Sequence, residues 1–260
     1  MPIEATEESE IDAAEYSAEG ITELPNCKTL FIPDEGYTFF DIDYSGADAR
    51  VVAWDSQCKF LMDIFNDPTQ DLYAVLASEY YKRKISKKDK ERQTFKAVCH
   101  ATNYLGKAPT IAGRANLSIS EVDMVQKWYF SVCPEVKKWQ DNIIKSVNSR
   151  GFIENVFGAR GWFIDKSDKN LYNKAVAWVP QSTIGILVNR GLVNIAKNEK
   201  PSNVRVLMQT HDSLSGQFLS TDKEAEKRII DHMSIELQYR TPLVIPAGIK
   251  TSTKSYGDCE

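Results

Sequence analysis

Residues 37–50, with the sequence YTFFDIDYSGADAR, form a pattern in which a strand turns directly into a helix. Tyr37–Asp43 is rich in aromatic and β-branched residues and has glycines near both ends, which predicts a β-strand. The alanine- and valine-rich segment Ala47–Ser56 then predicts a helix. Asp43 stands at the junction of the two elements. Because an aspartate in that place most often caps the helix, it does not by itself indicate a functional site.

A second aspartate lies in a late hairpin. Val204–Gln209 and Leu214–Leu219 predict two short strands joined by a tight turn that contains Asp212. Aspartate is common in turns because it bonds its own backbone, so this residue is also unremarkable alone. If the hairpin lies beside the first strand, however, Asp43 and Asp212 converge at one edge of a sheet. Two converging carboxylates are what a site for two divalent cations requires.

The third pattern is a stripe along the helix predicted over Lys87–Leu105. Arg92, Lys96, His100 and Tyr104 recur every four residues and therefore wind slowly along one face, over about 18 Å. Two cations followed by two rings match a nucleoside triphosphate lying along the helix, with its phosphates at the cationic end. The alternative is a solvated basic face, because several lysines precede the stripe.

The remaining patterns predict an α+β fold, with strands at both ends of the chain and a helical block between them. Further helices are predicted over Asp71–Lys84, Ser118–Cys133, Pro134–Arg150, Asp168–Lys197 (with a kink at Pro180) and Asp222–Tyr239, and a hairpin with strands Phe152–Phe157 and Trp162–Asp165.

Charge divides the 260-residue chain into a tail and a body. The first 24 residues carry eight acidic and no basic residues, which leaves 32 basic and 28 acidic residues, a net charge of +4, in residues 25–260. We expect the tail, residues 1–24, to be disordered; a docking segment for a partner is the alternative.

Apolar runs and cysteines narrow the class of protein further. The best apolar run, Ile184–Val193, is short and is interrupted by Asn189 and Arg190, so no membrane partner is expected. The five cysteines are scattered and lack CxxC spacing, which argues against a disulfide scaffold or a zinc site. This cysteine usage favours a cytoplasmic location.

Taken together, these segments resemble the motifs of the family-A DNA polymerases, which include the bacterial repair polymerase and many phage replicases. Asp41–Arg50 resembles motif A, Arg92–Tyr104 resembles motif B, and Gln209–Asp212 resembles motif C. Gln181 resembles the glutamine that reaches the minor groove of the primer–template. The order and spacing of all four fit, and the resemblance covers nearly everything from Lys28 onward. Motifs A and B are most similar to those of phage-encoded members, for which the expected cytoplasm is that of the host.

The resemblance implies a right-hand polymerase architecture that lacks the thumb. An antiparallel-sheet palm would comprise residues 25–60 and 166–260, and a helical fingers insertion would comprise residues 61–165. The implied activity is template-directed addition of deoxynucleotides to a primer 3′ end. The implied partners are primer–template DNA and dNTPs.

The resemblance also implies roles for the residues of motif A and motif C. Asp43, Asp212 and the backbone carbonyl of Tyr44 would hold two Mg²⁺ ions, as cofactors of phosphoryl transfer. Asp48 falls where the family usually has a glutamate that excludes the ribose 2′-hydroxyl. Because Asp48 is one methylene shorter, its ribose exclusion is expected to be weaker.

For the helical stripe, the resemblance implies contacts with the incoming nucleotide. Arg92 and Lys96 would bind its phosphates, and Lys96 would protonate the leaving pyrophosphate as general acid. His100 replaces the usual aromatic residue beside the sugar and base, and Tyr104 would lie beneath the templating pair. On the DNA side, the primer terminus and minor groove would be contacted by Gln181, Gln209 and His211.

Two other functions and one further partner are considered. A single-subunit RNA polymerase shares this fold, but it carries a small residue where this chain has Asp48. A non-catalytic DNA-binding subunit would not need Asp43, Lys96, Arg92 and Asp212.

Because the family's thumb and the segment before motif A have no counterpart here, we expect a second polypeptide to carry the thumb and the exonuclease. It would dock on apolar surface near residues 25–36; a truncated sequence is the alternative.

Overall fold

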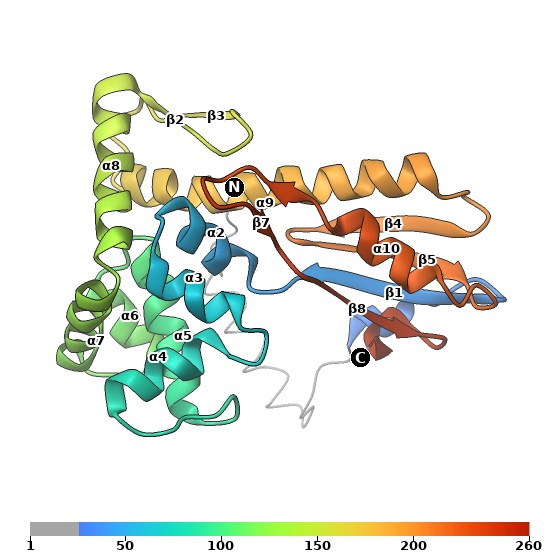
Figure 1. Ribbon diagram of the computed structural model, residues 1–260, viewed down its shortest axis with the longest axis horizontal. Coiled ribbons are helices and arrows are strands. Elements are labelled where there is room, and N and C mark those ends of the chain that lie inside the picture. Colours follow the sequence, from blue (N-terminus) through green and yellow to red (C-terminus); the bar gives the residue numbers. More distant parts are fainter. Residues whose placement is uncertain (1–25, 260) are drawn as a thin grey trace, which may run out of the picture.

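The computed structural model describes residues 26–259, and Figure 1 shows a sheet at one end of the molecule and a body of helices at the other. The sheet is antiparallel, with strand order β4-β5-β1-β8. Its strands are β1 (Tyr37–Tyr44), β4 (Val204–Thr210), β5 (Ser213–Leu219) and β8 (Ala247–Ser252). The strand and hairpin predicted from the two ends of the chain are therefore neighbours, and the predicted α+β class is confirmed.

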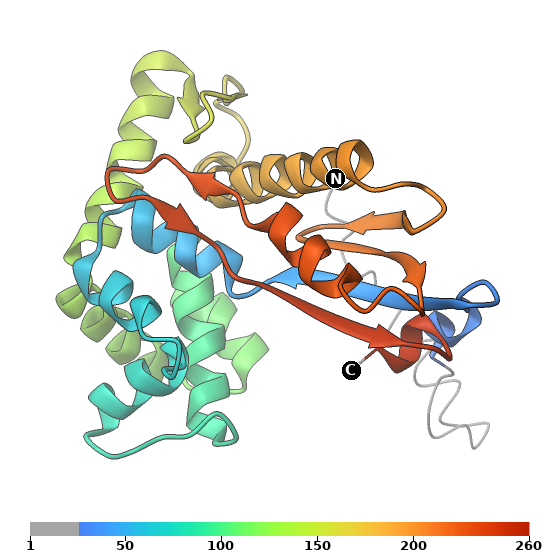
Figure 2. The ribbon, with the colours of Figure 1, turned by 45° about the vertical axis from the view of Figure 1, so that its right-hand side comes forward.

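One face of β1 is buried along its length, and the other is exposed only near the end of the strand. In β1, Phe40 and Ile42 are fully buried, whereas Asp43 is exposed, because successive side chains of a strand point to opposite faces. The buried face packs against two helices, α9 (Leu171–Asn198) and α10 (Ala225–Met233), which also contact each other. Figure 2 shows the long helix α9 running alongside the sheet. On the other face of β1, Phe39 is buried and stacks on Tyr256, whereas Asp43 is free for other contacts.

A glycine allows β4 and β5 to lie against the ring of Phe40. A Cβ at Gly216 would come within 2.1 Å of the Arg205 carbonyl oxygen and 2.9 Å of the Phe40 ring. Across from Gly216, the register of β4 shifts between Val206 and Met208, which is a β-bulge. A larger residue at position 216 would push the hairpin away from β1, and with it the turn that carries Asp212.

The helical body follows β1 in the chain and shares one hydrophobic core with the sheet. At its centre, Phe95 packs against Tyr80 and Trp128, with ring centroids 5.3 and 5.8 Å away. The predicted capping box at Ser118 is present, with Glu121 as its partner. The helices are α2 (Ala47–Asp55), α3 (Lys59–Asn66), α4 (Leu72–Tyr81), α5 (Lys90–Asn103), α6 (Ala108–Ala115), α7 (Ile119–Val132) and α8 (Pro134–Arg150).

Several short elements differ from the sequence prediction. The helix predicted over Asp222–Tyr239 is wrong beyond Met233, because Leu237 and Leu243 are buried in a small two-stranded pair instead. The strands of the predicted hairpin are also shorter, and the second begins at Arg160. Helices α3 and α6 and strand β8 were not predicted. The strands outside the main sheet are β2 (Phe152–Glu154), β3 (Arg160–Trp162), β6 (Glu236–Leu237) and β7 (Leu243–Val244).

Exposed apolar side chains gather just before β1. Leu30, Phe31 and Ile32 are 79%, 50% and 69% exposed among the described residues, at the end of the short 3₁₀ helix η1 (Cys27–Leu30). This is the apolar surface expected near residues 25–36. The acidic tail, residues 1–24, lies outside the described residues. Across residues 26–259, no helix has the length and apolar character needed to cross a membrane.

Candidate active site

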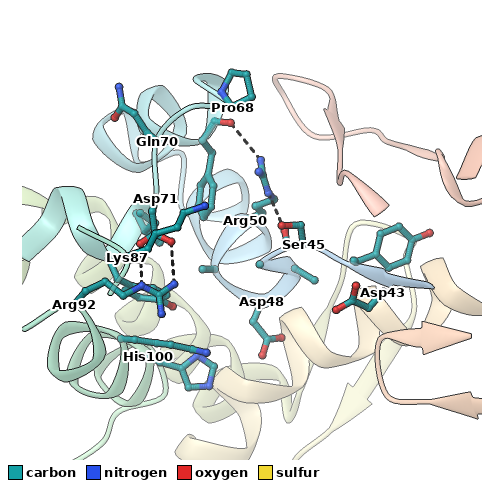
Figure 3. Close-up of a pocket in the computed structure, with 18 of the residues that line it drawn as sticks. Asp43, Ser45, Asp48, Arg50, Pro68, Gln70, Asp71, Lys87, Arg92 and His100 are labelled. Carbon is teal, nitrogen blue, oxygen red and sulfur yellow. Dashed lines mark hydrogen bonds and ion pairs between the residues drawn. The ribbon is translucent and has the colours of Figure 1, made fainter. Parts of the chain in front are cut away.

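A cleft of about 480 Å³ opens where the sheet meets the helical body, between the end of β1, helix α2, and helices α4 and α5. Figure 3 shows Asp43 on one side of it, Arg92 with Asp71 on the other, and Asp48 between them. Most of the residues predicted from the sequence line this cleft: Asp43, Tyr44, Asp48, Arg92, Lys96, His100 and Asp212.

The two predicted metal ligands meet through the pairing of β1 and β5. Asp43 lies opposite Ser213, and the backbone N–H of Tyr44 donates to the carbonyl oxygen of Asp212 at 3.4 Å. Partial burial raises the pKa of Asp43, and the negative charges of Asp212 and Asp41 raise it further. The carboxylates therefore repel one another in the protein alone, which is the electrostatic condition that a bound cation relieves.

The donor set at this edge fits Mg²⁺. Within residues 26–259, no three His, Cys, Asp or Glu side chains gather as a complete metal cage. Mg²⁺ does not need one, since it usually takes one or two carboxylates and completes its shell with water and substrate phosphates. The Tyr44 side chain is buried, and its hydroxyl donates to the Met233 carbonyl at 2.7 Å. Only the backbone of Tyr44 is therefore available to a metal, as the resemblance implies.

Asp48 reaches the cleft because the chain turns sharply after β1. Gly46 has a left-handed backbone, with φ of +61°, and caps helix α2, so that Asp48 lies in the first helical turn. Burial raises the pKa of Asp48, while the nearby His100 favours its charged form. Burial in turn lowers the pKa of His100. Both residues line the cleft, close enough for the charge of one to influence the pKa of the other.

Arg92 is paired with Asp71, which sequence reasoning did not identify. Its Nε and Nη2 donate to the two carboxylate oxygens of Asp71 at 3.0 and 2.9 Å. Asp71 also caps α4 by accepting the N–H of Ala74 at 2.9 Å. Burial opposes the charge on Asp71, but these hydrogen bonds outweigh it, and the pKa of Asp71 lies below its usual value. The available signal was an aspartate as the first residue of a predicted helix, where such a residue is a typical cap.

Three further cleft residues also escaped sequence reasoning. Arg50 donates to the carbonyl oxygens of Ser45 and Phe65 at 3.0 and 3.3 Å, and its guanidinium lies 4.4 Å from the centre of the Phe65 ring. Tyr73 lies under Arg92, with 5.7 Å between the guanidinium carbon and the ring centre. Lys87 adds another cation. Because several lysines lie next to it in the sequence, nothing there distinguished it as a residue of the cleft.

The end of the predicted stripe leaves the main cleft. Tyr104 follows α5 and lines a separate, mainly apolar pocket of about 410 Å³, with Ile111 and Arg114 from α6. His100 lines both pockets, and its ring meets that of Tyr104 edge-on at 5.0 Å. The Tyr104 hydroxyl is buried near the Asp48 carboxylate, and burial and that negative charge both raise the pKa of Tyr104. The stripe therefore crosses from one pocket to the other, because four residues overshoot one helical turn.

The three residues predicted to contact DNA lie outside both pockets. Gln181 is exposed on α9 directly after Pro180, which the helix passes through without ending. Gln209 is exposed near the end of β4, and His211 is exposed in the turn before Asp212, with φ of +49°. None of the three lines the cleft, and their contacts with DNA stay predictions.

Comparison with curated proteins finds DNA polymerases of bacteria, animals and phages. The chain is 24% identical over 228 residues to DNA polymerase I of Caldicellulosiruptor bescii, covering 84% of this chain and 27% of that protein. It is 24% identical over 251 residues to DNA polymerase theta of Drosophila melanogaster, covering 90% and 12%. The DNA polymerase of Mycobacterium phage D29 is 28% identical over 133 residues, covering 51% and 22%. The chain thus spans about a quarter or less of these relatives.

The fold agrees with a solved polymerase domain. The POL domain of Pol1 from M. smegmatis, in complex with DNA primer-template and dNTP, superposes with a TM-score of 0.78 at 21% identity. The match covers 89% of this chain and 42% of that one. A family model described as DNA polymerase family A matches residues 18–255. With the antiparallel sheet, the paired aspartates and the cationic helix on one cleft, this match means that the chain belongs to DNA polymerase family A.

Proposed function

We propose that the cleft catalyses template-directed addition of deoxynucleotides to a primer 3′ end. One observation carries the proposal: Asp43 and Asp212 line the same cleft as Lys96 and Arg92. Anionic ligands on one wall and cations on the other are what a magnesium-bound triphosphate requires. The polymerase domain of M. smegmatis Pol1, which has this fold, was solved with primer-template and dNTP.

The side chains would divide the reaction among them. The primer 3′-oxygen attacks the α-phosphorus, a new P–O bond forms, and the bond to pyrophosphate breaks. Asp43, Asp212 and the Tyr44 carbonyl would hold two Mg²⁺ ions, which assist loss of the 3′-hydroxyl proton and neutralise the triphosphate. Lys96 would donate a proton to the leaving pyrophosphate, and Arg92 would hold the phosphates.

The other predicted residues would set the fit of substrate and DNA. Asp48 and His100 line the cleft where the sugar and base would lie. Tyr104, in the neighbouring pocket, would lie beneath the templating pair. Gln181, Gln209 and His211 are exposed, and would contact the primer–template outside the cleft.

A primer-extension assay tests this proposal. The full chain would be incubated with primer–template, Mg²⁺ and either dNTPs or NTPs. Extension with dNTPs is the expected result. Preference for NTPs would instead favour the RNA-polymerase alternative, and binding of primer–template without extension would favour a non-catalytic DNA-binding subunit.

We further propose that a second polypeptide docks on Leu30, Phe31 and Ile32 and adds contacts with the phosphates of the primer–template. Their exposure supports a contact surface there, and residues 25–260 carry a net charge of only +4 for holding DNA phosphates. Extension by this chain alone is then expected to be distributive at about 0.1 M salt, because DNA affinity is largely electrostatic. Processive extension by the purified chain at that salt would contradict the need for a partner.

A further inference from the structure

We infer that Asp71 is a positioning residue that holds Arg92 in the orientation in which it meets the triphosphate. The inference rests on the proposed function, since it names a residue that would set nucleotide affinity in the same cleft. Asp71 and Arg92 come from different elements, 21 residues apart in the chain, and their side chains meet at the cleft wall. Figure 3 shows the two dashed contacts between them.

The pair uses one edge of the guanidinium and leaves the other edge available. Asp71 accepts from Nε and from one proton of Nη2, so the carboxylate occupies one side of the fork. Of the five guanidinium N–H groups, the second Nη2 proton and both Nη1 protons remain. Nη1 makes one longer contact, 3.3 Å to Oε1 of the neighbouring Gln93. The donor edge that faces away from Asp71 is therefore the edge that can bind a phosphate.

Asp71 can hold Arg92 because Asp71 is itself held. Its Oδ1 accepts the Ala74 N–H, which ties the carboxylate to the first turn of α4. The side chains of Arg92 and Asp71 are 18% and 14% exposed, so the pair is shielded from most of the water that would compete with it. The Tyr73 ring lies against the guanidinium on a third side. An arginine normally loses much rotamer freedom when it binds a ligand, and here that freedom is already lost.

The charge of Asp71 does not abolish the attraction between this wall and a triphosphate. Both carboxylate oxygens already accept hydrogen bonds, and Lys96, Lys87 and Arg50 add further cations to the same cleft. The orientation of Arg92 is therefore expected to contribute more to phosphate binding than the charge of Asp71 subtracts. Removing that charge should weaken binding.

Titration of inorganic tripolyphosphate into the full chain tests the inference without requiring catalysis. Asp71→Asn removes the charge but keeps a side-chain oxygen for the cap, because asparagine caps helices about as well as aspartate. We expect Asp71→Asn to weaken binding about 5-fold, through loss of the fixed arginine orientation. In an Arg92→Ala background the same substitution should have no further effect. Asp141→Asn breaks an exposed ion pair with Lys137 on α8, outside the cleft, and is the matched control.

The outcomes separate the inference from the proposed function. Unchanged or tighter binding in Asp71→Asn, an equal loss in the Arg92→Ala background, or no binding by the wild type would overturn the positioning role. In primer extension, Asp71→Asn should raise KM for dNTP several-fold while kcat stays within about 2-fold, whereas a general folding defect would lower kcat. A wild-type chain that binds tripolyphosphate through Arg92 but does not extend a primer would overturn the proposed function alone.

Discussion

The two walls of the cleft shift the pKa values of their aspartates in opposite directions. At the sheet edge, burial and the neighbouring charges of Asp212 and Asp41 raise the pKa of Asp43. On the helical wall, hydrogen bonds from Arg92 and Ala74 outweigh burial and hold the pKa of Asp71 below its usual value. The first wall gathers like charges, and the second pairs opposite charges.

This difference distinguishes a group of carboxylates that could bind a cation from a carboxylate that is already paired with a cation of the same chain. Mutually repelling carboxylates lower the stability of a folded protein, and groups with perturbed pKa values concentrate at functional sites. A paired carboxylate such as Asp71 needs no ligand, and can instead hold another side chain in place. Substitutions at the two walls test this contrast.

Neutralising the sheet edge should have the largest effect. Asp43→Asn or Asp212→Asn should lower the primer-extension rate at least ~100-fold, because each removes a charged oxygen ligand from a catalytic centre that works mainly by electrostatics. Circular dichroism and DNA binding should be nearly unchanged. Asp41→Asn is the matched control, since Asp41 is held by a hydrogen bond from Ser215 at 2.7 Å, and should cost far less. Wild-type rates in either Asp43→Asn or Asp212→Asn would disprove the metal-ligand assignment.

Removing cations from the helical wall should have a smaller effect, of two distinct kinds. Lys96→Ala should lower the single-turnover rate by about 10- to 100-fold, as expected for loss of a general acid. Arg92→Ala should mainly weaken dNTP binding, because the proposed role of this cation is to hold the phosphates. Lys90→Ala, an exposed position on the same helix, is the control for loss of positive charge. If Lys96→Ala and Arg92→Ala both lost DNA affinity and kept dNTP affinity, α5 would be a duplex-binding face.

Changing the residue between the two walls should alter selectivity more than rate. Asp48→Ala should raise incorporation of ribonucleotides relative to deoxyribonucleotides several-fold, since it opens space beside the 2′-carbon. Asp48→Glu should have the opposite effect, because its extra methylene fills that space. The measurement is competitive incorporation of dNTP and NTP on one primer–template. An unchanged ratio in both variants would mean that Asp48 does not lie beside the sugar.

The smallest expected effect is on the stability of the metal-free protein. Asp43 has a raised folded-state pKa, so its favourable contribution exists at low pH and is lost as the pH rises through that pKa. The pKa of Asp71 is lowered, so its contribution exists at neutral pH and is lost only as the pH falls through its folded-state pKa. In EDTA at pH 7, Asp43→Asn should therefore raise Tm by about 1–2 °C, and Asp71→Asn should lower it. Thermal unfolding at pH 7 and below pH 4 measures both, and a lower Tm in Asp43→Asn at pH 7 would contradict the repulsion.

Local patterns were sufficient to predict much of the fold and seven of the residues that line the cleft. The strand that ends near Asp43, the hairpin around Asp212 and the helix with Lys96 each follow from side-chain periodicity within one segment. The misassigned elements are short, and contacts with distant segments stabilise them. Strand β8 is stabilised by its pairing with β1. The helix ends at Met233 because Leu237 and Leu243 are buried where β6 pairs with β7. Such pairings leave little local signal.

The sequence by itself determined that Asp43 ends a strand and that Arg92 and Lys96 share one helix face, because an aspartate at a strand end and cations at a helical spacing of four are properties of single elements. Only the tertiary structure decided how those groups meet. The β1–β5 register places Asp43 opposite Ser213, next to Asp212, and the packing of α4 against α5 joins Asp71 to Arg92. It also assigned Tyr104 to a second pocket. The physical reason is that charge repulsion and pairing act through space, and depend on distances between segments that the order of residues does not specify.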